Sequence, residues 1–520
     1  MPLAMNRAVI ERDALLTFLL AVGLVSLNFW LQGSVGINFA DEGFLWYGTA
    51  QTAVGQVPLR DFQSYDPGRY YWTALWAPMF GTGIVGVRLA VAVFQLCGVF
   101  LGLLVVRRVV SAWWVRCLVG IVLVAWMFPH FKVFEPTVEI AAVYVGVCLL
   151  EKPSRKRHFL AGVFVGVAAF FGRNLGLYSF LAGAMLIAFI QMRIQREAVL
   201  SCLCAWGLGI VVGSLPLLLM ALVIPGFAWA FLDSILWLFS LGTTNLPLPV
   251  PWPWSGMHQR FVANDRLAFM VVEFGFVAFP LFFLVAVLLL LKYPLVDRQR
   301  QSVLVASTCV GMWYMHYAFS RADLSHLAMS LSPFLLGVVA LPAFVGAREH
   351  SWLSRLVLGG LVVFTIGPAY LGSPFVRFCY RTPCVPYQLH GETLWLRPGE
   401  RDLIETVRQM VLERVRPEEG IFIAPHWPAF YRILQRPSPT WQIYFLFPER
   451  MDRQEAIIAD LRKNNVQWVI LGDAALDRRE ALRFRHTHSF VWLFLMQNFA
   501  PVEIKGLPSG YQLLHLKTED

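Results

Sequence analysis

The feature that most constrains this chain is a succession of apolar runs, each long enough to cross a bilayer, between residue 15 and about residue 372. A helix needs about 20 apolar residues to cross a hydrocarbon core of about 30 Å. Of the 520 residues, 57% are hydrophobic and only 15% are charged, which is more apolar surface than a soluble protein of this size needs. The sequence therefore predicts a polytopic α-helical membrane protein. The first run, Leu15–Ile37, is too long for a signal-peptide core and precedes no clear small-residue cleavage site, so we interpret it as a retained span.

Eleven spans can be placed along the chain, and an odd number puts the two termini on opposite sides of the membrane. Two of them are short for a bilayer core, and the run at 71–106 is long enough to hold an interfacial or re-entrant piece at 71–80 before a span that starts near residue 83. Arg88 then lies near the outer surface, where it snorkels to the interface. The predicted spans are 14–37, 71–106, 114–131, 137–150, 158–172, 175–192, 199–224, 268–291, 302–320, 326–347 and 352–372.

The loops between these spans fall into two sets of different charge. By the positive-inside rule the basic set is cytoplasmic, so the N-terminus is cytoplasmic and residues 373–520 are extracytoplasmic, as in a protein of the bacterial inner (plasma) membrane. The net charge of +10 is then a signal of orientation rather than of nucleic-acid binding, for which no motif is present. The basic set contains Arg7, Arg12, Arg107, Arg108, Lys152, Arg155, Lys156, Arg157, Arg193, Arg196, Lys292, Arg298, Arg300, Arg348 and Arg355. The opposite set contains Asp41, Glu42, Asp61, Asp66, Lys132, Glu135, Arg173, Asp265, Arg321 and Asp323.

The C-terminal segment has a different pattern from the rest. Helical periodicity at Arg401–Val415 and Glu449–Lys463 alternates with short apolar runs at Ile421–Ala424 and Val466–Leu471. This alternation predicts a small α/β domain over residues 373–520, after a membrane domain over 1–372. The segment has no Gly-rich phosphate loop, so we do not expect a nucleotide site.

The eight cysteines divide by position. Cys379 and Cys384 lie outside the spans, where an oxidising compartment allows them to pair; a disulfide between them is one of two open alternatives. No Cys/His spacing indicates a zinc site. The other six lie in or near predicted spans, where we expect packing roles: Cys97, Cys117, Cys148, Cys202, Cys204 and Cys309.

Mixed polar groups gather in the loops of the outer face. Charged groups at membrane depth are costly and usually line a cavity or a pathway. The stretch FADEGFLWYGTAQ, Phe39–Gln51, puts Asp41 and Glu42 at the mouth of the first span. The aromatic and apolar residues of Gly43–Val54 recur at helical spacing, which predicts an amphipathic helix lying flat on the outer leaflet. The two acids would then be held at the interface, between a spanning helix and an interfacial one.

This loop carries a resemblance to a known family. An acidic pair after the first span, then Tyr47, Gly55-Gln-Val-Pro-Leu-Arg-Asp61 and Pro67-Gly-Arg-Tyr-Tyr71, resembles the first extracytoplasmic loop of GT-C glycosyltransferases. Within that class the chain is similar to bacterial enzymes that use lipid-linked sugars: the aminoarabinose transferase of lipid A, the protein O-mannosyltransferases and the Rgt-type lipopolysaccharide-core sugar transferases. The resemblance covers about residues 10–370 and is strongest over 37–90.

Two later stretches also resemble loop motifs of these enzymes, Arg173-Asn-Leu-Gly-Leu-Tyr178 and Arg321-Ala-Asp-Leu-Ser-His326. Asn174 stands where the family leads us to expect an acid, so the resemblance supplies no carboxylate at that position.

The resemblance implies a specific reaction. The donor is a sugar on a polyprenyl phosphate or diphosphate, and an acceptor hydroxyl attacks its anomeric carbon on the outer face with inversion. The leading carboxylate of the first loop, Asp41, acts as the base. The residues agree with this chemistry, because displacement at an anomeric carbon needs a carboxylate to take the acceptor's proton and cations where the phosphate departs. The polyprenyl tail needs an apolar groove open to lipid, which a broad membrane domain supplies.

Each candidate in the first loop also has a structural interpretation. We interpret Asp41 as the base in preference to the structural alternatives, a solvated residue or a helix N-cap at the end of the span. Glu42 is a second catalytic carboxylate, a metal ligand or a surface residue. Asp61 and Asp66 are typical turn residues, and Asp66 is also a candidate for substrate contact together with Arg69.

The later loops supply the candidates for phosphate binding. Arg321 suits bidentate binding of the lipid phosphate, or pairs with Asp323 to fix the loop. His326 either binds phosphate or caps a helix, and Arg173 is another phosphate candidate. A second polar patch contains Lys132, Glu135 and Glu139.

Two further features stay open. In the loop PLPVPWPWSGMHQRF, residues 247–261, Trp252 and Trp254 favour an interfacial aromatic belt over stacking on a sugar. A divalent cation is compatible with the carboxylates, but no residue spacing is specific for one, so no cofactor is assigned.

The sequence thus predicts an integral membrane glycosyltransferase that moves a sugar from a polyprenyl-phosphate donor to a lipid, glycan or protein acceptor of the cell envelope. Membrane lipids are its other partners. A transporter or flippase of lipid-linked glycans is the alternative from another class, but such proteins show repeated halves with a midplane site, and no repeat is seen. An O-antigen-type polymerase or ligase is a third reading, and a non-catalytic scaffold a fourth. The sugar, the acceptor, the oligomeric state and the role of the C-terminal domain are not specified.

Overall fold

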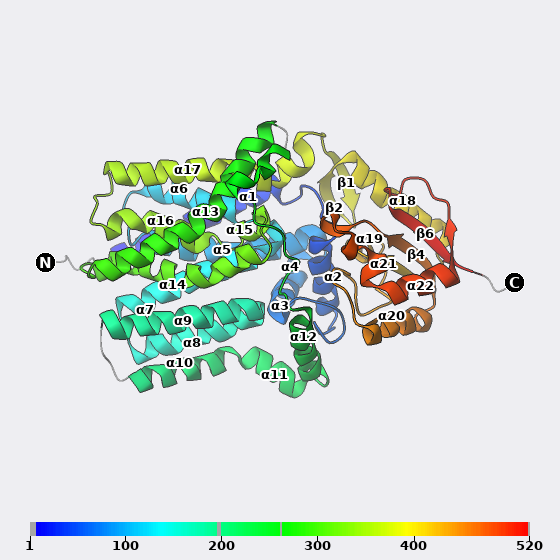
Figure 1. The fold of residues 1–520 in the computed structure, drawn as a ribbon, viewed down its shortest axis with the longest axis horizontal. Helices are drawn as coiled ribbons and strands as arrows, with labels where there is room; N and C mark the ends of the chain where they lie inside the picture. Colours follow the sequence, from blue (N-terminus) through cyan, green and yellow to red (C-terminus); the bar gives the residue numbers. More distant parts are fainter. Residues whose placement is uncertain (1–6, 195–198, 261–262, 518–520) are drawn as a thin grey trace. The chain divides into compact units, whose positions relative to one another are not determined.

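The computed structural model describes residues 7–194, 199–260 and 263–517. The chain forms two compact units, coloured by sequence in Figure 1. We call the first the helical unit; it comprises Met1–Gly33, Arg88–Ala228 and Ile235–Arg377. We call the second the mixed unit; it comprises Ser34–Val87, Trp229–Ser234 and Phe378–Asp520. Among the predicted basic residues, Arg196 lies outside the described residues.

The helical unit is built almost entirely from long apolar helices. α14 packs against α7, α9 and α16, and α8 packs against α9 and α10. The helices are α1 (Arg7–Gln32), α5 (Ile84–Val106), α6 (Trp113–Trp126), α7 (Phe134–Glu151), α8 (Arg155–Phe171), α9 (Arg173–Arg193), α10 (Val199–Gly213), α11 (Leu215–Val223), α12 (Phe227–Leu241), α13 (Ala263–Lys292), α14 (Arg298–Ser320), α15 (Leu324–Ala328), α16 (Ser332–Phe344) and α17 (Trp352–Gly372), with short turns η1 (His130–Lys132), η2 (Pro253–Ser255), η3 (Met257–Arg260) and η4 (Phe375–Tyr380).

Glycines let two of these helices approach closely. A Cβ atom on Gly162 of α8 would lie 2.0 Å from the carbonyl oxygen of Trp206, and one on Gly209 of α10 would lie 2.1 Å from that of Phe159. Small residues at helix contacts allow backbones to touch in this way, which is typical of helices that associate inside membranes.

Five of the described helices are long and apolar enough to cross a membrane: Glu11–Gln32, Ile84–Val106, Arg173–Arg193, Asp265–Lys292 and Trp352–Gly372. A sixth is added if α10 and α11, which meet at a bend of 50°, form one broken span. The predicted number of eleven is therefore not confirmed. Each predicted range does contain a helix, but α6 and α16 are short, with 14 and 13 residues, and α7 carries three glutamates. The long run 71–106 is divided, because its first part lies in α3 (Pro67–Leu75) and α4 (Ala77–Phe80).

The mixed unit combines the first loop with the C-terminal segment. Its main sheet has the order β3 (Gly420–Ala424), β4 (Val466–Gly472), β6 (Tyr511–Leu516), β5 (Phe499–Val502); β3 and β4 are parallel and the other neighbours antiparallel. β1 (Val385–Leu389) and β2 (Glu392–Leu396) form an antiparallel hairpin. The helices are α2 (Asp41–Ala53), α3, α4, α18 (Pro398–Arg414), α19 (Ala429–Ile433), α20 (Met451–Lys463), α21 (Phe484–Thr487) and α22 (Ser489–Asn498), with turns η5 (Leu476–Arg478) and η6 (Glu480–Leu482).

The predicted alternation of helix and strand at the C-terminus is present. Buried residues of β3, β4 and β6 pack with α20 and α22 in one apolar core, whose largest side chains include Phe422, Phe445 and Phe484. The predicted strands coincide with β3 and β4, and the predicted helices with α18 and α20.

The prediction that Gly43–Val54 lies flat on the outer leaflet is wrong. In α2 nearly every residue is buried, including Phe44, Trp46 and Tyr47. A Cβ on Gly43 would lie 2.5 Å from the backbone nitrogen of Ala429 in α19. α2 is therefore a core element of the mixed unit rather than an amphipathic surface helix.

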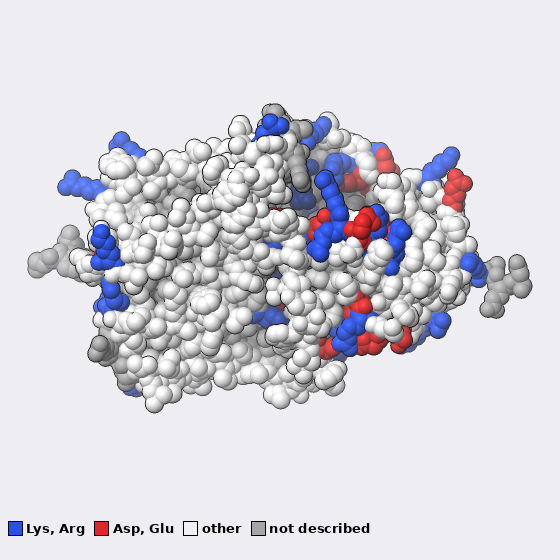
Figure 2. Space-filling model, viewed as in Figure 1, with Lys and Arg blue, Asp and Glu red and all other residues white. Residues whose placement is uncertain are grey.

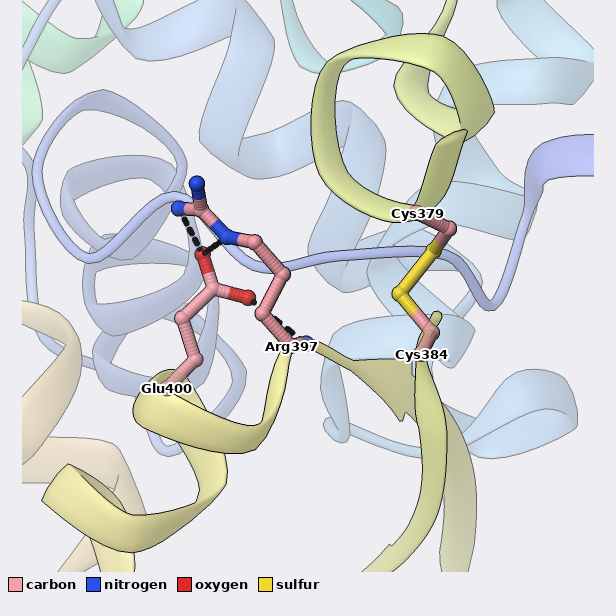
Figure 3. Close-up of a disulfide and its surroundings, with 4 residues drawn as sticks. All are labelled: Cys379, Cys384, Arg397 and Glu400. Atoms are coloured by element: carbon pink, nitrogen blue, oxygen red, sulfur yellow. Dashed lines mark hydrogen bonds and ion pairs between the residues drawn. A yellow bond between two sulfur atoms is a disulfide. The ribbon is translucent and has the colours of Figure 1, made fainter. Parts of the chain in front are cut away.

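A disulfide joins Cys379 in η4 to Cys384, the residue before β1 (Figure 3). Nearby, Arg397 begins α18, where its backbone N–H donates to Glu400 Oε2 at 3.2 Å and its guanidinium pairs with Glu400 Oε1 at 2.5 Å (Figure 3). Both features fix the backbone at the start of the C-terminal segment.

Candidate functional site

Asp41 and Glu42 both lie in the first turn of α2, but their side chains differ in burial and in hydrogen bonding. Glu42 is 2% exposed, and its Oε2 accepts a hydrogen bond from the backbone N–H of Asn38 at 3.1 Å. Asn38 Oδ1 in turn accepts from the N–H groups of Ala40 and Asp41 at 3.0 and 3.1 Å. This exchange caps α2. Asp41 does not cap the helix itself, and its side chain is only partly buried.

The carboxylate of Asp41 receives a hydrogen bond from the far end of the chain. The hydroxyl of Tyr444 donates to Asp41 Oδ1 at 3.2 Å. Tyr444 is held by Gln63 of the first loop, whose Oε1 accepts from the N–H groups of Ile443 and Tyr444 at 3.0 and 2.9 Å and whose Nε2 donates to the carbonyl of Tyr444 at 3.0 Å. Gln63 of the first loop thus holds Tyr444 in place, and Tyr444 orients Asp41 of the same loop.

His426 lies next to this pair, two residues after the end of β3. Its ring centroid is 6.2 Å from that of Tyr444, at an interplanar angle of 89°. Burial lowers the pKa of His426 to about 4, so the imidazole is neutral at pH 7. Its Nε2 is buried without a hydrogen-bond partner among the described residues. The mixed unit therefore places a neutral histidine, a tyrosine and a carboxylate in one neighbourhood.

The other first-loop candidates take separate positions. Asp66 and Arg69 are 8% and 6% exposed and lie at the start of α3, with the Arg69 guanidinium over the ring of Tyr65. Asp61 instead pairs with Arg60 at 2.8 Å and accepts the N–H of Val57 at 2.7 Å. Asp61 is therefore a turn-fixing residue.

The helical unit carries the second group of candidates, where α14 ends and α15 begins. Asp323 Oδ2 accepts from Arg321 Nε at 3.1 Å, and Asp323 Oδ1 accepts from the N–H of His326 at 2.9 Å. Arg321 also donates to the carbonyl of Leu246 at 3.0 Å. Burial alone would raise the pKa of Asp323, but the hydrogen bonds from His326 and the charge of Arg321 outweigh it and lower the pKa.

Both ring nitrogens of His326 are engaged. Nδ1 lies 2.8 Å from Asp323 Oδ1, and Nε2 lies 2.9 Å from Nδ2 of Asn245. An amide nitrogen only donates, so Nε2 accepts and the proton sits on Nδ1. In this arrangement His326 caps α15 and fixes the loop that carries Arg321.

Further polar residues lie at the same end of these helices. The hydroxyl of Tyr317 donates to Glu135 Oε1 at 3.3 Å, and its ring lies 5.4 Å from that of His326. Lys132 ends the short turn before α7, and Arg173 is the first residue of α9. Glu135 and Glu139 are 2% and 0% exposed. We call the set Lys132, Glu135, Arg173, Tyr317, Arg321, Asp323 and His326 the polar end of the helical unit.

The structure adds two observations on the remaining candidates. Trp252 and Trp254 stack on each other with centroids 5.3 Å apart, and Trp254 is 74% exposed. Within the described residues, no three His, Cys, Asp or Glu side chains gather as metal ligands. We derive no step through a divalent cation.

Several residues in these networks were not found from the sequence. Tyr444 contacts Asp41, and Gln63 and His426 contact Tyr444. Asn245 and Tyr317 contact residues of the polar end. None belongs to a motif, and Tyr444 is 403 residues from Asp41. Only the placement of polar residues in otherwise apolar stretches could have indicated Tyr317.

The fold of this chain is similar to that of solved protein structures. The chain is similar to the crystal structure of ArnT from Cupriavidus metallidurans bound to undecaprenyl phosphate, with a TM-score of 0.54 and 13% identity, over 96% of this chain and 97% of that one. Lower scores are found with apo ArnT from the same organism (0.46, 15% identity, 97% and 98% covered) and with the Archaeoglobus fulgidus oligosaccharyltransferase in the apo form (0.43, 12% identity, 90% and 70% covered). No family model and no curated protein matches.

Proposed function

We propose that this protein is an integral membrane glycosyltransferase that moves a sugar from a polyprenyl-phosphate donor to an acceptor of the cell envelope, on the extracytoplasmic side and with inversion. The observation that carries the proposal is the carboxylate of Asp41, which starts α2, takes no part in capping it, and is oriented by Tyr444. The fold shared with an ArnT structure that holds undecaprenyl phosphate supports a lipid-phosphate donor.

In this proposal Asp41 accepts the proton of the acceptor hydroxyl as that oxygen attacks the anomeric carbon. A positioned base contributes about 10²–10⁴-fold to such a step. Tyr444 donates to Asp41 Oδ1 and so orients the carboxylate that takes the proton. His426, neutral at pH 7, adds no positive charge that would compete for the carboxylate.

Cations are needed where the lipid phosphate departs. We assign this role to Arg321, Arg173 and Lys132 of the polar end, and to Arg69 of the mixed unit as a second source. Asp323 and His326 act as positioning residues, since they hold the loop of Arg321. Asp66 is assigned to substrate contact, and Glu42 to holding the turn that presents Asp41.

The test is donor turnover in liposomes. Wild type, Asp41→Asn and Asp61→Asn are each supplied with a panel of labelled polyprenyl-phosphate sugars and a crude envelope extract as acceptor source, and loss of label from the lipid is followed. We expect one donor to be consumed, with a rate at least about 100-fold lower in Asp41→Asn and nearly unchanged in Asp61→Asn.

Asp61 is the matched control because it is an aspartate of the same loop whose contacts are confined to its own turn. Equal turnover by Asp41→Asn and wild type would remove Asp41 as the base. If no donor is consumed by any of the three proteins, the transferase proposal fails, and movement of lipid-linked glycans across the bilayer is assayed next.

A further inference from the structure

A cavity of about 330 Å³ lies at the opposite end of the helical unit from the polar end. It is lined where α5 and α16 end and where α6, α14 and α17 begin. α14 has 23 residues, so at 1.5 Å per residue its two ends are about 34 Å apart. The cavity belongs to no part of the proposed catalytic machinery, and its volume is within the range of ligand pockets, about 300–1,000 Å³.

Four arginines line this cavity: Arg107, Arg108, Arg300 and Arg348. Lys and Arg side chains also surface at this end of the helical unit, at the left of Figure 2. One carboxylate, Glu349, is present, but it accepts from the N–H groups of Ser111 and Ala112 at 3.1 and 2.7 Å. The cavity therefore keeps an excess of positive charge.

Ion pairs within the protein differ among these four arginines. Arg107 and Arg108 pair with Asp13 and Glu151, at 3.4 and 2.5 Å. Arg300 has only an exposed contact with Asp297 at 3.6 Å, and no other described side chain pairs with Arg348. Arg300 also lies in the first turn of α14, where the helix dipole disfavours a cation. The fold gains little from holding these two charges together, which indicates an anionic ligand.

The rest of the lining identifies the kind of anion. Val339 and Pro342 of α16 and Val357 and Leu358 of α17 supply an apolar wall beside the arginines. A free phosphate ion gains no favourable contact from apolar side chains, whereas a lipid carries both a phosphate and apolar acyl chains. Basic pockets between membrane helices on the cytoplasmic side are known to suit anionic lipid headgroups.

We propose that this cavity binds the phosphate headgroup of an anionic membrane lipid. Arg300 and Arg348 contact the phosphate, Arg107 and Arg108 hold the local potential positive, and the wall of α16 and α17 contacts the start of the acyl chains. The site is separate from the sugar-transfer site and does not depend on the proposed function.

The test measures lipid retention by the purified full-length chain in detergent, by native mass spectrometry, during titration with phosphatidylglycerol, cardiolipin or phosphatidylcholine. The variant is Arg300→Gln with Arg348→Gln. The matched control is Arg298→Gln with Arg355→Gln, two exposed arginines near the same helix starts that do not line the cavity.

We expect the wild type to retain the two anionic lipids over phosphatidylcholine. The cavity variant should bind them about 25-fold more weakly, since each arginine near an anionic lipid contributes roughly fivefold. The control should change by about twofold or less. Equal weakening by both pairs would mean only a diffuse surface charge and would overturn the proposal, as would unchanged binding in a cavity variant that unfolds at the wild-type temperature.

A cavity-filling variant and a competition measurement complete the test. Ala347→Trp fills the cavity from a loop and leaves all four arginines in place. If the double variant does not fold, loss of anionic-lipid retention in Ala347→Trp supports the proposal and full retention overturns it. Inorganic phosphate and glycerol phosphate are added as competitors; displacement of the lipid by either at concentrations similar to the lipid's own would assign the cavity to a soluble phosphate and overturn the lipid assignment.

Discussion

The two ends of the helical unit both carry charged residues, but they hold them in different ways. At the polar end, charges of both signs are buried or half-buried and are joined by hydrogen bonds, as in the set Arg321, Asp323 and His326. At the cavity end, charges of one sign dominate, and Arg300 and Arg348 are exposed. The same α14 connects the two ends.

The two ends should therefore respond differently to substitution. Where a charged group is enclosed and its partners have no water to replace it, one substitution disturbs the whole network. Where charges are exposed and repeated, each contributes little to stability, and only their sum acts on a ligand. Single substitutions should therefore be informative at the polar end, and combined ones at the cavity end.

The largest effect on stability is expected for Asp323→Ala. This change removes the acceptor for Arg321 Nε and for the N–H and ring of His326, and it removes the N-cap of α15. Hydrogen bonds to a charged group contribute about 1.5–3 kcal/mol, so we expect unfolding to become easier by about 2–3 kcal/mol. The measurement is thermal unfolding of the detergent-solubilised protein, together with donor turnover, which should fall because Arg321 loses its orientation.

The comparison residue for this change is Asp297, at the cavity end. Its pair with Arg300 spans 3.6 Å between side chains that are 53% and 59% exposed. An exposed pair of this kind contributes about 0–1 kcal/mol. Asp297 also caps α14 by accepting the N–H of Arg300 at 3.1 Å, so Asp297→Ala should cost about 1 kcal/mol, less than Asp323→Ala. A loss in Asp297→Ala as large as that in Asp323→Ala would break the distinction between the two ends.

The next prediction concerns pH. The pKa of Asp323 is lowered in the folded protein, so its ionised form is favoured by folding. The stabilisation is complete above the ordinary value of 3.8 and is lost as the pH falls below it through the folded pKa. We therefore expect the difference in unfolding temperature between wild type and Asp323→Asn to be constant near neutral pH and to shrink as the pH falls below the ordinary pKa of 3.8. A difference that did not shrink at low pH would show that the carboxylate charge is not what the network uses.

The sequence predicted the helices and the position of the acidic pair because both depend on local information. Apolar runs mark helices whatever surrounds them, and Asp41 follows directly after the first run. It could not predict that α2 is buried, since aromatic residues suit a lipid surface and a protein core equally well. Tyr444, Gln63 and His426 reach the neighbourhood of Asp41 only through the tertiary fold. The number of spans also depends on whether short or charged helices such as α6 and α7 cross a bilayer, which length and composition alone do not decide.

A smaller effect on stability than at Asp323 is expected at Glu349, where stability and lipid binding can be measured on the same variant. It is the one carboxylate among the described residues that line the cavity, and it caps the start of α6 through Ser111 and Ala112. Burial opposes its ionisation, but these hydrogen bonds outweigh burial and lower the pKa of Glu349. Glu349→Ala should therefore cost about 1 kcal/mol of stability, the usual value of a helix cap, which is less than the cost of Asp323→Ala.

The same substitution should change lipid binding in the opposite direction. Removal of a negative charge from a cavity that holds a phosphate should tighten retention of phosphatidylglycerol by roughly fivefold, even though the protein is less stable. A variant that merely loosened this end of the helical unit would bind lipid more weakly as it lost stability. Opposite signs for the two measurements therefore separate a cavity tuned for an anion from a set of arginines that only orients the protein in the membrane.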